Sequence, residues 1–569
     1  MNFFFLTALL LICACTKSGK KENILSISLT GDISTLDPAN CYDTVCYVPV
    51  AQIYEPLYEI EYLKRPYTLR PLLAESMPIV STNQLKYTFK IKRGIKYHAS
   101  LLIPEGREVK SRDFIMQLKR LAYLGTNSRG WWLFDGKIKG LNDWRKSVKN
   151  DFERFFTEPI AGIYALDDYT FSIELIRPYP QLIYAMAMSF TAPLPEEAVR
   201  AAKNDFQSVT MGTGPYIVTD YNSNQGVSLE KNEHYISSTY PVDGDRFAHE
   251  KNLLKDANAK LPFIKKIRLH VIKESQTDWF NFLKQKTDIL NLTTDHSHAA
   301  LTADGKLKPE IAKDNISLQT SPTLIYWWLS FNMKDPVLGK NLNLRKAIAH
   351  GINIDKFIEL FTYKIAQKAN SIYPPGIAGY TPSTELPYKY DLALAKEYLA
   401  KSGYPEGKKL PHLQFDTRGT DTIKRQMGEF IQQELKNIGI IVDVNTNSFP
   451  TFLEKSRKGE LQFWQGGWVM DYPDSENVLQ LLSSSNLPPG PNSSQYVNAE
   501  FDSLFEKLKE MRDGPEKTDL MRKMERIVND DLPWIMQYYT RNYILYHHYL
   551  ENFRYSDIIY NGPKYLKIK

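Results

Sequence analysis

The stretch from His412 to Val444 constrains the fold most strongly because it predicts a strand, a helix and a second strand in succession. HLQFDT predicts the first strand. Apolar residues then recur at helical spacing from Thr422 to Ile438, and Gly439 stands where a helix commonly ends. IIVDV, at 440–444, predicts the second strand. A β-α-β unit places its two strands parallel in one sheet, so the sequence predicts an α/β fold.

Further strands and helices are predicted in both halves of the chain. Runs that alternate β-branched or aromatic residues with polar ones predict four strands, at Ile24–Leu29, Lys86–Lys92, Tyr169–Leu175 and Ile264–Ile272. A helix is predicted after Asp391, a suitable N-cap, and the turn-rich stretch at 483–494 predicts a loop. The chain has 569 residues, of which 43% are hydrophobic. That is enough for about two to four domains.

The N-terminus predicts export and lipidation. The apolar run from Phe3 to Ala14 is too short to span a bilayer and fits the hydrophobic part of a secretory signal, although the usual positive start is missing. The run ends in ICAC, which resembles a bacterial lipobox. By that resemblance residues 1–14 are a signal peptide, Cys15 carries lipid, and 15–23 form a polar tether. The alternative is an ordinary signal with incidental cysteines.

Cys41 and Cys46 form a second pair of cysteines close in sequence. In an exported protein the four residues between them favour a local disulfide, which stabilises only modestly because the closed loop is short. Zinc binding is the alternative. No histidine lies nearby in the sequence, and two cysteines alone do not make a metal site.

Composition and motifs give no support to several classes of function. The 71 basic and 65 acidic residues nearly balance, and no dense basic patch with interleaved aromatics predicts a nucleic-acid partner. The motifs of serine hydrolases, zinc peptidases, phosphate loops and dinucleotide-binding folds are absent from the sequence. The His clusters at 295–298 and 547–548 could in principle bind metal, but such short clusters are usually solvated or satisfied locally, and the Asp-rich stretch at 471–476 lacks the spacing of a calcium loop. We therefore expect a protein that is not an enzyme and has no cofactor and no metal site.

The stretch QFWQGGWVMDYPDSENV, at 462–478, places Asp471 among aromatic residues with no Lys or Arg nearby in sequence. A buried carboxylate without a cation costs several kcal/mol or takes up a proton. Asp471 is therefore exposed, or its cation comes from elsewhere in the fold or from a ligand.

A series of motifs occurs in the order found in one known family. The motifs are STLDPA at 34–39, IYEPLYEI at 53–60, LRPLLAESM at 69–77, YTFKIKRGIKYH at 87–98, GTGPYIV at 212–218, LSFNMKDPVLGKNLNLRKAIAHGINID at 329–355, SIYPPGIAGY at 371–380, YDLALAKEYLAKSGY at 390–404, GWVMDYPDSENVLQLLSSS at 467–485 and NAEFDSLFEK at 498–507. Together they cover nearly the whole chain after its N-terminal segment. By these motifs the chain resembles the family-5 extracellular solute-binding proteins, the peptide-binding lipoproteins of ABC importers.

The resemblance implies a two-lobed α/β fold, the type II periplasmic-binding-protein fold of cluster C, with an inserted domain and a two-stranded hinge. By this resemblance lobe I takes residues 24–52, 155–272 and 533–569, the inserted domain takes 53–154, and lobe II takes 273–532. The hinge strands are expected near Arg268–Glu274 and Pro533–Tyr539. The ligand is expected to be engulfed when the lobes close.

The resemblance also implies which residues bind the ligand. In peptide-binding members the acid of the GW-x-x-D pattern meets the α-ammonium of the ligand, and here that acid is Asp471, shortly after Trp468. The alternative is that Asp471 caps a turn before Pro473. Trp328 belongs either to the wall of the ligand pocket or to the core. Asn332 either contacts the ligand or hydrogen-bonds its own turn.

The expected partners follow from the same resemblance. They are peptides, bound along their backbone as an added strand, and the permease subunits of an ABC importer. The protein is expected to be a monomer in the periplasm or on the outer cell surface, lipid-anchored to a membrane. Gln465 and Gly466 stand where some peptide binders carry a basic residue, so the partner of a peptide's C-terminal carboxylate is not identified. The alternatives are the same fold with a nickel chelate, haem or an oligosaccharide, and a surface sensor or adhesin that keeps the fold.

Overall fold

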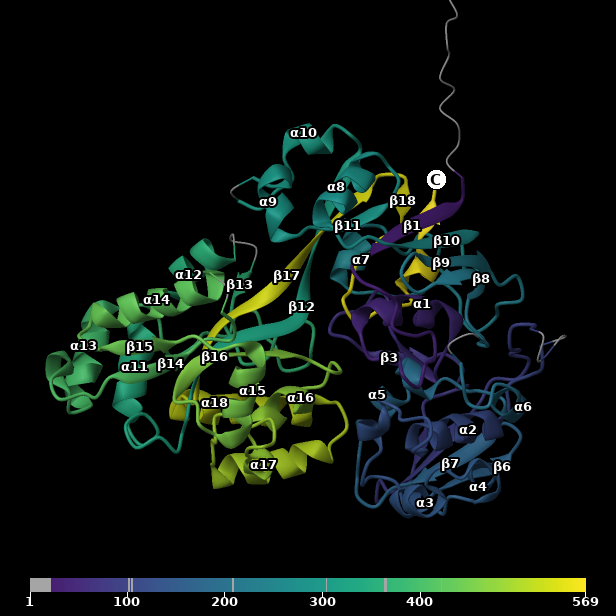
Figure 1. Ribbon diagram of the computed structural model, residues 1–569, viewed down its shortest axis with the longest axis horizontal. Helices are drawn as coiled ribbons and strands as arrows, with labels where there is room; N and C mark the ends of the chain where they lie inside the picture. The colour runs from purple at the N-terminus through teal and green to yellow at the C-terminus, as the bar shows by residue number, and fades with distance from the viewer. Residues whose placement is uncertain are drawn as a thin grey trace, which may run out of the picture.

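The computed structural model describes residues 22–100, 103, 106–206, 209–302, 304–362, 366–420 and 422–569. It forms two α/β lobes, and a smaller layered domain extends one of them (Figure 1). Cys15 and the predicted signal peptide lie outside these residues. Within the described ranges, no helix has both the length and the apolar character needed to cross a membrane.

One 11-stranded sheet runs through both lobes. Its lobe I strands are β1 (Ile24–Leu29), β8 (Tyr216–Asn222), β9 (Gly226–Lys231), β10 (Lys266–Val271) and β11 (Ile289–Asn291). The remaining strands are β12 (Ile316–Phe331), β13 (Gln367–Lys368), β14 (Leu413–Asp416), β15 (Val442–Asn445), β16 (Phe463–Val469) and β17 (Trp534–His547). The strand order is β15-β14-β16-β12-β17-β11-β1-β10-β9-β8, and β13 pairs with β17 off this path.

The lobe I half of the sheet is built around the parallel strands β1 and β10. Their register places Ile24 opposite Lys266 and Leu29 opposite Val271. Alternate side chains of these strands face the core: Leu25, Leu29, Ile267 and Leu269 are buried. The predicted strand at Ile24–Leu29 is confirmed, and the one at Ile264–Ile272 is confirmed over its central residues. The helices around this part of the chain are α1 (Thr44–Ile53), α5 (Leu182–Ala185), α6 (Glu196–Ala201) and α7 (Arg246–Glu250).

Lobe II contains the predicted β-α-β unit. β14 and β15 pair in parallel, and the helix α14 (Thr422–Lys436) connects them, so this prediction is confirmed. The predicted helix after Asp391 is α13 (Leu392–Lys401), and the Asp391 side chain accepts a bond from the backbone N–H of Leu394 as an N-cap does. The other helices of this lobe are α11 (Leu342–Gly351), α12 (Ile354–Phe361), α15 (Phe449–Lys458), α16 (Glu476–Leu479), α17 (Ala499–Lys509) and α18 (Pro515–Asp531).

Two long antiparallel strands, β12 and β17, cross between the lobes (Figure 1). β17 pairs with β11 of lobe I through its residues 544–546, and it pairs with β12 between Trp534 and His547. The predicted hinge segment Pro533–Tyr539 falls at the start of β17, whereas Arg268–Glu274 lies in and just after β10. The helices α8 (Ser275–Leu283), α9 (Thr294–Ala300) and α10 (Pro309–Ala312) lie at the lobe I end of the crossing strands.

The inserted domain has its own four-stranded sheet, and its strands are β4 (Ile79–Val80), β5 (Lys86–Lys90), β6 (Ile163–Asp167) and β7 (Thr170–Glu174). The strand order is β4-β5-β7-β6. The helices α2 (Ser111–Ala122), α3 (Leu141–Val148) and α4 (Phe152–Thr157) accompany this sheet. The sheet therefore draws on residues up to 174, beyond the 53–154 expected from the sequence. Two small two-stranded sheets pair β2 (Tyr58–Ile60) with β3 (Leu69–Pro71) and β18 (Leu550–Glu551) with β19 (Lys567–Ile568).

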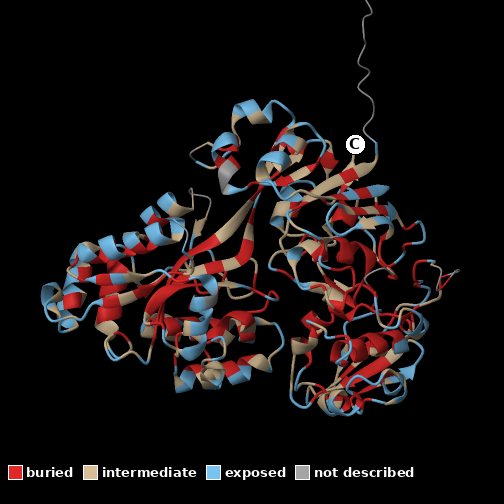
Figure 2. Ribbon diagram, viewed as in Figure 1, coloured by how far each residue is buried: buried red, intermediate tan, exposed pale blue. Residues whose placement is uncertain are grey.

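Buried side chains form several apolar cores (Figure 2). One core joins lobe I to the inserted domain, for example through Leu25, Phe89 and Phe171. Lobe II packs a second core around its β-α-β unit, including Phe415, Ile431 and Phe463. A third core includes residues from both lobes, for example Tyr62 and Tyr240 together with Trp328 and Phe501, so the lobes are packed against each other beside the crossing strands.

Candidate functional site

Asp471 lies two residues after the end of β16 and is held by one side chain, Asn477 of α16. The Asn477 amide nitrogen donates to Asp471 Oδ2 at 2.9 Å, and its Oδ1 accepts from the Asp471 backbone N–H at 3.2 Å. The same Oδ1 accepts from Trp468 Nε1 at 2.9 Å. Asn477 is fully buried. It therefore fixes both the carboxylate and the tryptophan, and the structure brings these two predicted site residues together.

Asp471 has no ion-pair partner among the lysines, arginines and histidines of the described ranges. Asp471 is exposed in the structure, yet the protein around its carboxyl group displaces enough water to raise its pKa above the ordinary value. The bond from Asn477 lowers the pKa and only partly offsets this effect. The site thus offers a carboxylate that a cation from outside the protein would stabilise.

The two glycines before Trp468 are explained by two tryptophans on the neighbouring strand. Trp328 is opposite Gly466 and Trp327 is opposite Gly467 in the antiparallel pairing of β12 with β16. A Cβ added at Gly466 would lie 2.5 Å from the Trp328 ring, and one at Gly467 would lie 2.5 Å from the Trp327 ring. Any larger residue at either position would displace an indole ring.

Arg418 lies against the same strand, on the face that Trp327 also covers. It follows the carboxyl end of β14, and a Cβ at Gly467 would lie 2.8 Å from its Nη1. Its guanidinium carbon stands 5.1 Å from the centre of the Trp327 ring and 5.5 Å from that of Phe449. Gly467 therefore leaves room for a cation to approach the backbone of β16.

The guanidinium of Arg418 is only partly satisfied. Its Nη1 is buried without a hydrogen-bond partner, and it forms no ion pair with a carboxylate in the ranges that the structure describes. The nearby Asp416 is bound by Lys455 at 2.7 Å and by Asn447 at 2.9 Å. Burial lowers the pKa of Arg418. Arg418 is therefore a cation that an external anion would stabilise.

Between Arg418 and Asp471 the outer edge of β16 is open. β16 pairs with β12 over its whole length, from Phe463 to Val469. On its other side β14 reaches only Phe463 and Trp464. No strand of the described residues pairs with the outer edge from 465 to 469. The unpaired N–H and C=O groups of such an edge can hydrogen-bond an extended backbone.

The lobes contact each other beside Asp471. The Tyr472 ring stacks on Tyr184 of α5 with the ring centres 5.8 Å apart. Farther from the site, Gln84 Nε2 donates to the backbone oxygen of Glu510 at 2.8 Å. Asp471 therefore lies at the junction of lobe I and lobe II.

The other predicted ligand residues lie elsewhere. Trp328 is 4% exposed and packs on Trp534 with the ring centres 4.4 Å apart. Asn332 directly follows Phe331, the last residue of β12, which pairs with Phe463 at the start of β16. Asp471 lies beyond Val469, at the opposite end of β16. Its amide nitrogen donates to the backbone oxygen of Leu461 at 2.9 Å, and its Oδ1 accepts from the Lys334 N–H at 3.0 Å. The structure therefore does not bring Trp328 or Asn332 to the Asp471 carboxylate.

Asn477 and Arg418 are site residues that the sequence did not predict. Arg418 had a detectable signal, because it directly follows a predicted strand of the β-α-β unit, and ligands of open α/β sheets bind at the carboxyl ends of strands. Asn477 had none, since its contact with Trp468 depends on how the chain turns after β16. Gln465, where a basic residue was sought, is buried and donates to Gln537 Oε1 at 2.8 Å.

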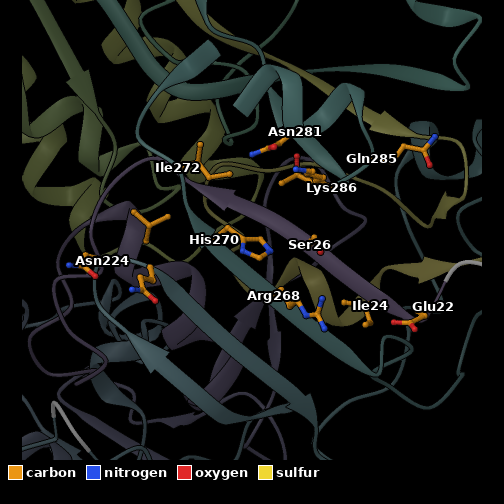
Figure 3. A pocket seen from close by; sticks show the side chains of 13 residues that line it. Glu22, Ile24, Ser26, Asn224, Arg268, His270, Ile272, Asn281, Gln285 and Lys286 are labelled. Carbon is orange, nitrogen blue, oxygen red and sulfur yellow. The ribbon is translucent and has the colours of Figure 1, made fainter. Parts of the chain in front are cut away.

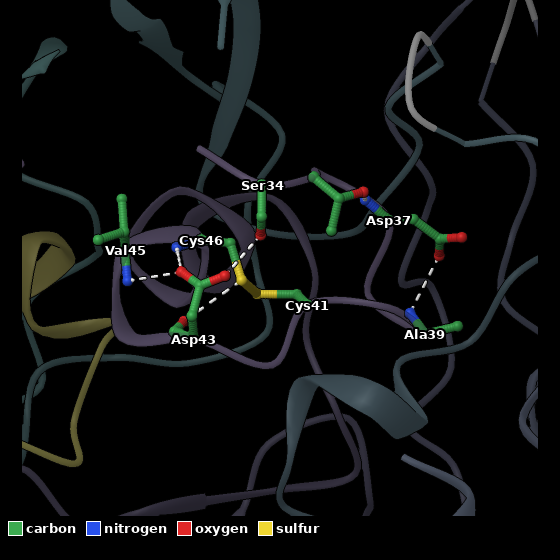
Figure 4. The surroundings of a disulfide bond; sticks show 8 residues. Ser34, Asp37, Ala39, Cys41, Asp43, Val45 and Cys46 are labelled. Carbon is green, nitrogen blue, oxygen red and sulfur yellow. Dashed lines mark hydrogen bonds between the residues drawn. A yellow bond between two sulfur atoms is a disulfide. The ribbon is translucent and has the colours of Figure 1, made fainter. Parts of the chain in front are cut away.

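Cys41 and Cys46 form a disulfide at the start of α1, with their Cα atoms 5.7 Å apart (Figure 4). Asp43, inside the closed loop, caps α1 by accepting bonds from the N–H groups of Val45 at 3.0 Å and Cys46 at 2.8 Å. Both cysteines are fully buried. The part of the chain that the structure describes holds no cluster of three or more His, Cys, Asp or Glu arranged for a metal ion.

A separate groove of about 740 Å³ lies on the outer face of the lobe I sheet (Figure 3). Ser26 of β1, Arg268 and His270 of β10, and Asn281 of α8 are among its lining residues. Neither Asp471 nor Arg418 lines this groove. The groove is therefore distinct from the junction between the lobes.

Comparison with known proteins identifies the family. The profile of the bacterial extracellular solute-binding proteins, family 5, matches residues 68–487. Heme-binding protein A of Haemophilus influenzae is 24% identical over 85% of this chain and 81% of its own length. The oligopeptide-binding protein OppA of Bacillus subtilis is 24% identical over 91% of this chain and 87% of its own length.

A solved structure shares the same architecture. HbpA2 from Haemophilus parasuis superimposes with a TM-score of 0.77 at 20% identity, covering 96% of this chain and all of its own. The two-lobed α/β fold predicted from the sequence is thereby confirmed. The family profile spans well over half of the 569 residues. The chain belongs to the family-5 bacterial extracellular solute-binding proteins.

Proposed function

We propose that this protein captures short peptides between its two lobes and delivers them to an ABC importer. The observation that carries the proposal is the Asp471 carboxylate, which has no cationic partner in the described chain and lies where the lobes meet. A peptide's α-ammonium is a cation of suitable size, and its binding would restore the pairing that the protein lacks.

Two further features support a peptide as the ligand. The outer edge of β16 presents unpaired backbone groups, which bind a peptide through its main chain and place little demand on its side chains. Arg418 offers a cation beside Gly467 for the C-terminal carboxylate. Together these features would bind the amine, the backbone and the carboxylate of one ligand.

The spacing of these features favours short peptides. Gly467, against which Arg418 lies, and Asp471 are four residues apart in the sequence. At about 3.3 Å per extended residue, the two positions are at most ~13 Å apart along the chain. A peptide of a few residues can reach both charges.

The proposal is tested by calorimetric titration with dipeptides to pentapeptides that have free, N-acetylated or C-amidated ends. We expect free peptides to bind and each blocked end to weaken binding. Mass spectrometry of the purified protein should also detect peptides that co-purify with it. The relative from Haemophilus influenzae is named as haem-binding, so haem is titrated in parallel. Haem binding that saturates at one equivalent, without binding of any peptide, would replace the proposal.

Anchoring belongs to the same proposal. An importer's binding protein must stay near its permease, and the lipobox-like ICAC would achieve this through lipid on Cys15, outside the described residues. Cys15→Ser is expected to release the protein into the soluble fraction or to leave its signal uncleaved. An unchanged membrane fraction together with an unchanged mass would reject lipidation without affecting the proposal of peptide binding.

A further inference from the structure

The loop closed by the Cys41–Cys46 disulfide presents an exposed aromatic ring. Tyr42 is 45% exposed, whereas the cysteines that bound the loop are fully buried. The loop is fixed a second time by Asp43, which caps α1 and accepts a bond from the Ser34 hydroxyl at 2.5 Å. A large exposed aromatic side chain on so constrained a loop is typical of a contact residue, because the chain orders the ring before any ligand binds.

Aromatic neighbours support the ring of Tyr42. Its centre lies 6.0 Å from that of Phe190, which also contacts Tyr47 edge-on at 6.0 Å. Tyr47 in turn stacks on Tyr560 at 5.1 Å. These contacts hold one part of the Tyr42 ring and leave the remainder open to solvent.

This aromatic group belongs to the part of lobe I that contacts lobe II beside Asp471, since Thr191, next to Phe190, hydrogen-bonds the backbone oxygen of Ala185, next to Tyr184. Phe190 lies six residues after Tyr184, which stacks on Tyr472 next to Asp471. Burial raises the pKa of Tyr42, and the negative charge of Asp471 raises it further. The charge of Asp471 also contributes to the raised pKa of Tyr47. The ring contacts place Tyr42 on the lobe I side of the junction at which Asp471 lies on the lobe II side, and the effect of the Asp471 charge on Tyr42 agrees with this placement.

We propose that Tyr42 forms the second half of the amine site: its ring contacts the ammonium that Asp471 holds, and the Cys41–Cys46 disulfide positions it to do so. The inference rests on the proposed function and assigns a specificity role to lobe I. An ammonium within about 6 Å of an aromatic ring is attracted by the ring's quadrupole. Because Asp471 belongs to lobe II and Tyr42 to lobe I, the ligand's amine would join the two lobes.

The test compares Tyr42→Leu with the unaltered protein by calorimetry. For peptides with a free amine, Tyr42→Leu should weaken binding about 5- to 30-fold, the range of a partly desolvated cation–π contact. Peptides with an N-acetyl group should show no such loss, because they carry no ammonium. Tyr42→Phe keeps the ring and should lose much less than Tyr42→Leu. Tyr390→Leu is the matched control, since Tyr390 is similarly exposed on lobe II next to α13.

A second arm tests the disulfide. The double variant Cys41→Ser/Cys46→Ser should lose affinity for free-amine peptides in the same direction, and adding Tyr42→Leu to it should cost little more. If the double variant does not fold, as judged by circular dichroism, the comparison of free-amine and N-acetyl peptides with Tyr42→Leu still tests the role of Tyr42. Equal losses for free and acetylated peptides, or no loss at all, would overturn the role of Tyr42. Loss of binding in Asp471→Asn alone would then leave the proposed function standing, whereas no peptide binding by the unaltered protein would reject both.

Discussion

Two single residues carry opposite charges that the described protein leaves unpaired. Asp471 is an acid with a raised pKa, and Arg418 is a base with a lowered one, because the surrounding protein displaces water from both charged groups, although Asp471 is exposed and Arg418 half-buried. Neighbouring charges show the usual arrangement, as when Lys517 binds Asp474 at 2.8 Å. Two uncompensated charges along one strand are costly for folding alone, and a zwitterionic ligand would remove both costs.

Arg418→Gln should weaken the binding of peptides with a free carboxylate by about 10- to 100-fold, because a charge-assisted bond contributes roughly 1.5–3 kcal/mol. C-amidated peptides should lose far less. Arg425→Gln, on the exposed face of α14, is the control. Calorimetry with both peptide forms gives the comparison, and equal losses for the two forms would remove Arg418 from the site.

Peptide affinity should fall in acid because of Asp471. Only the ionised carboxylate attracts an ammonium, and the pKa of Asp471 is raised from 3.8 in the free protein, so affinity should drop as pH falls through the raised value. Stability without ligand has the opposite sign: the folded state binds the proton more tightly than the unfolded chain. Asp471 therefore destabilises the fold above its folded pKa, and this loss is recovered as pH falls. Calorimetric titrations with peptide at several pH values should show this loss of affinity in acid for the unaltered protein and not for Asp471→Asn.

At the scale of elements, β16 is shaped by the indole rings beside it. Gly466 and Gly467 allow Trp328 and Trp327 to lie across the strand, and the second glycine also admits Arg418. The strand keeps one edge free because β14 is short and ends at Asp416. The site therefore depends on where a neighbouring strand stops as much as on the residues of β16.

Gly466→Ala should destabilise the protein by about 1–3 kcal/mol, because the added methyl group would lie 2.5 Å from the Trp328 ring, which packs on Trp534. The urea midpoint of unfolding should fall accordingly. Gly31→Ala serves as the control, since its added methyl group would meet only Val45 at 3.7 Å. A midpoint as high as that of the control would mean that Trp328 can shift without cost.

The elements that the sequence predicted are those set by local patterns. The strand at Ile24–Leu29 and the unit from Leu413 to Asn445 follow from alternation, helical spacing and a glycine stop. Asn477 and the role of Gly467 could not be predicted, because they depend on contacts between segments that only the folded chain brings together. Asp471 could be singled out from the sequence, because the stretch at 462–478 contains no Lys or Arg that could pair with it.

At the scale of the whole molecule, β12 and β17 connect two lobes that share one apolar core next to the crossing strands, and the lobes touch again at Tyr184 and Tyr472. Such an arrangement permits open and closed states, and a ligand held by both lobes favours the closed one. Small-angle scattering should therefore show a smaller radius of gyration when peptide is added. An unchanged profile at saturating peptide would mean that the free protein is already closed or that the lobes do not move.

The most direct test of the account is a thermodynamic cycle between Asp471 and the peptide amine. If the lobes close over the ligand, they bury the pair of Asp471 with the peptide amine, and removing one member of a buried charge pair costs roughly 3–5 kcal/mol; Asp471→Asn should therefore weaken the binding of a free peptide by about two to three orders of magnitude. N-acetylation of the peptide should cost a similar amount with the unaltered protein and little more with Asp471→Asn, as measured by calorimetry. Penalties that simply add would show that Asp471 does not hold the amine, and Asp471 would then be a turn-capping residue held by Asn477.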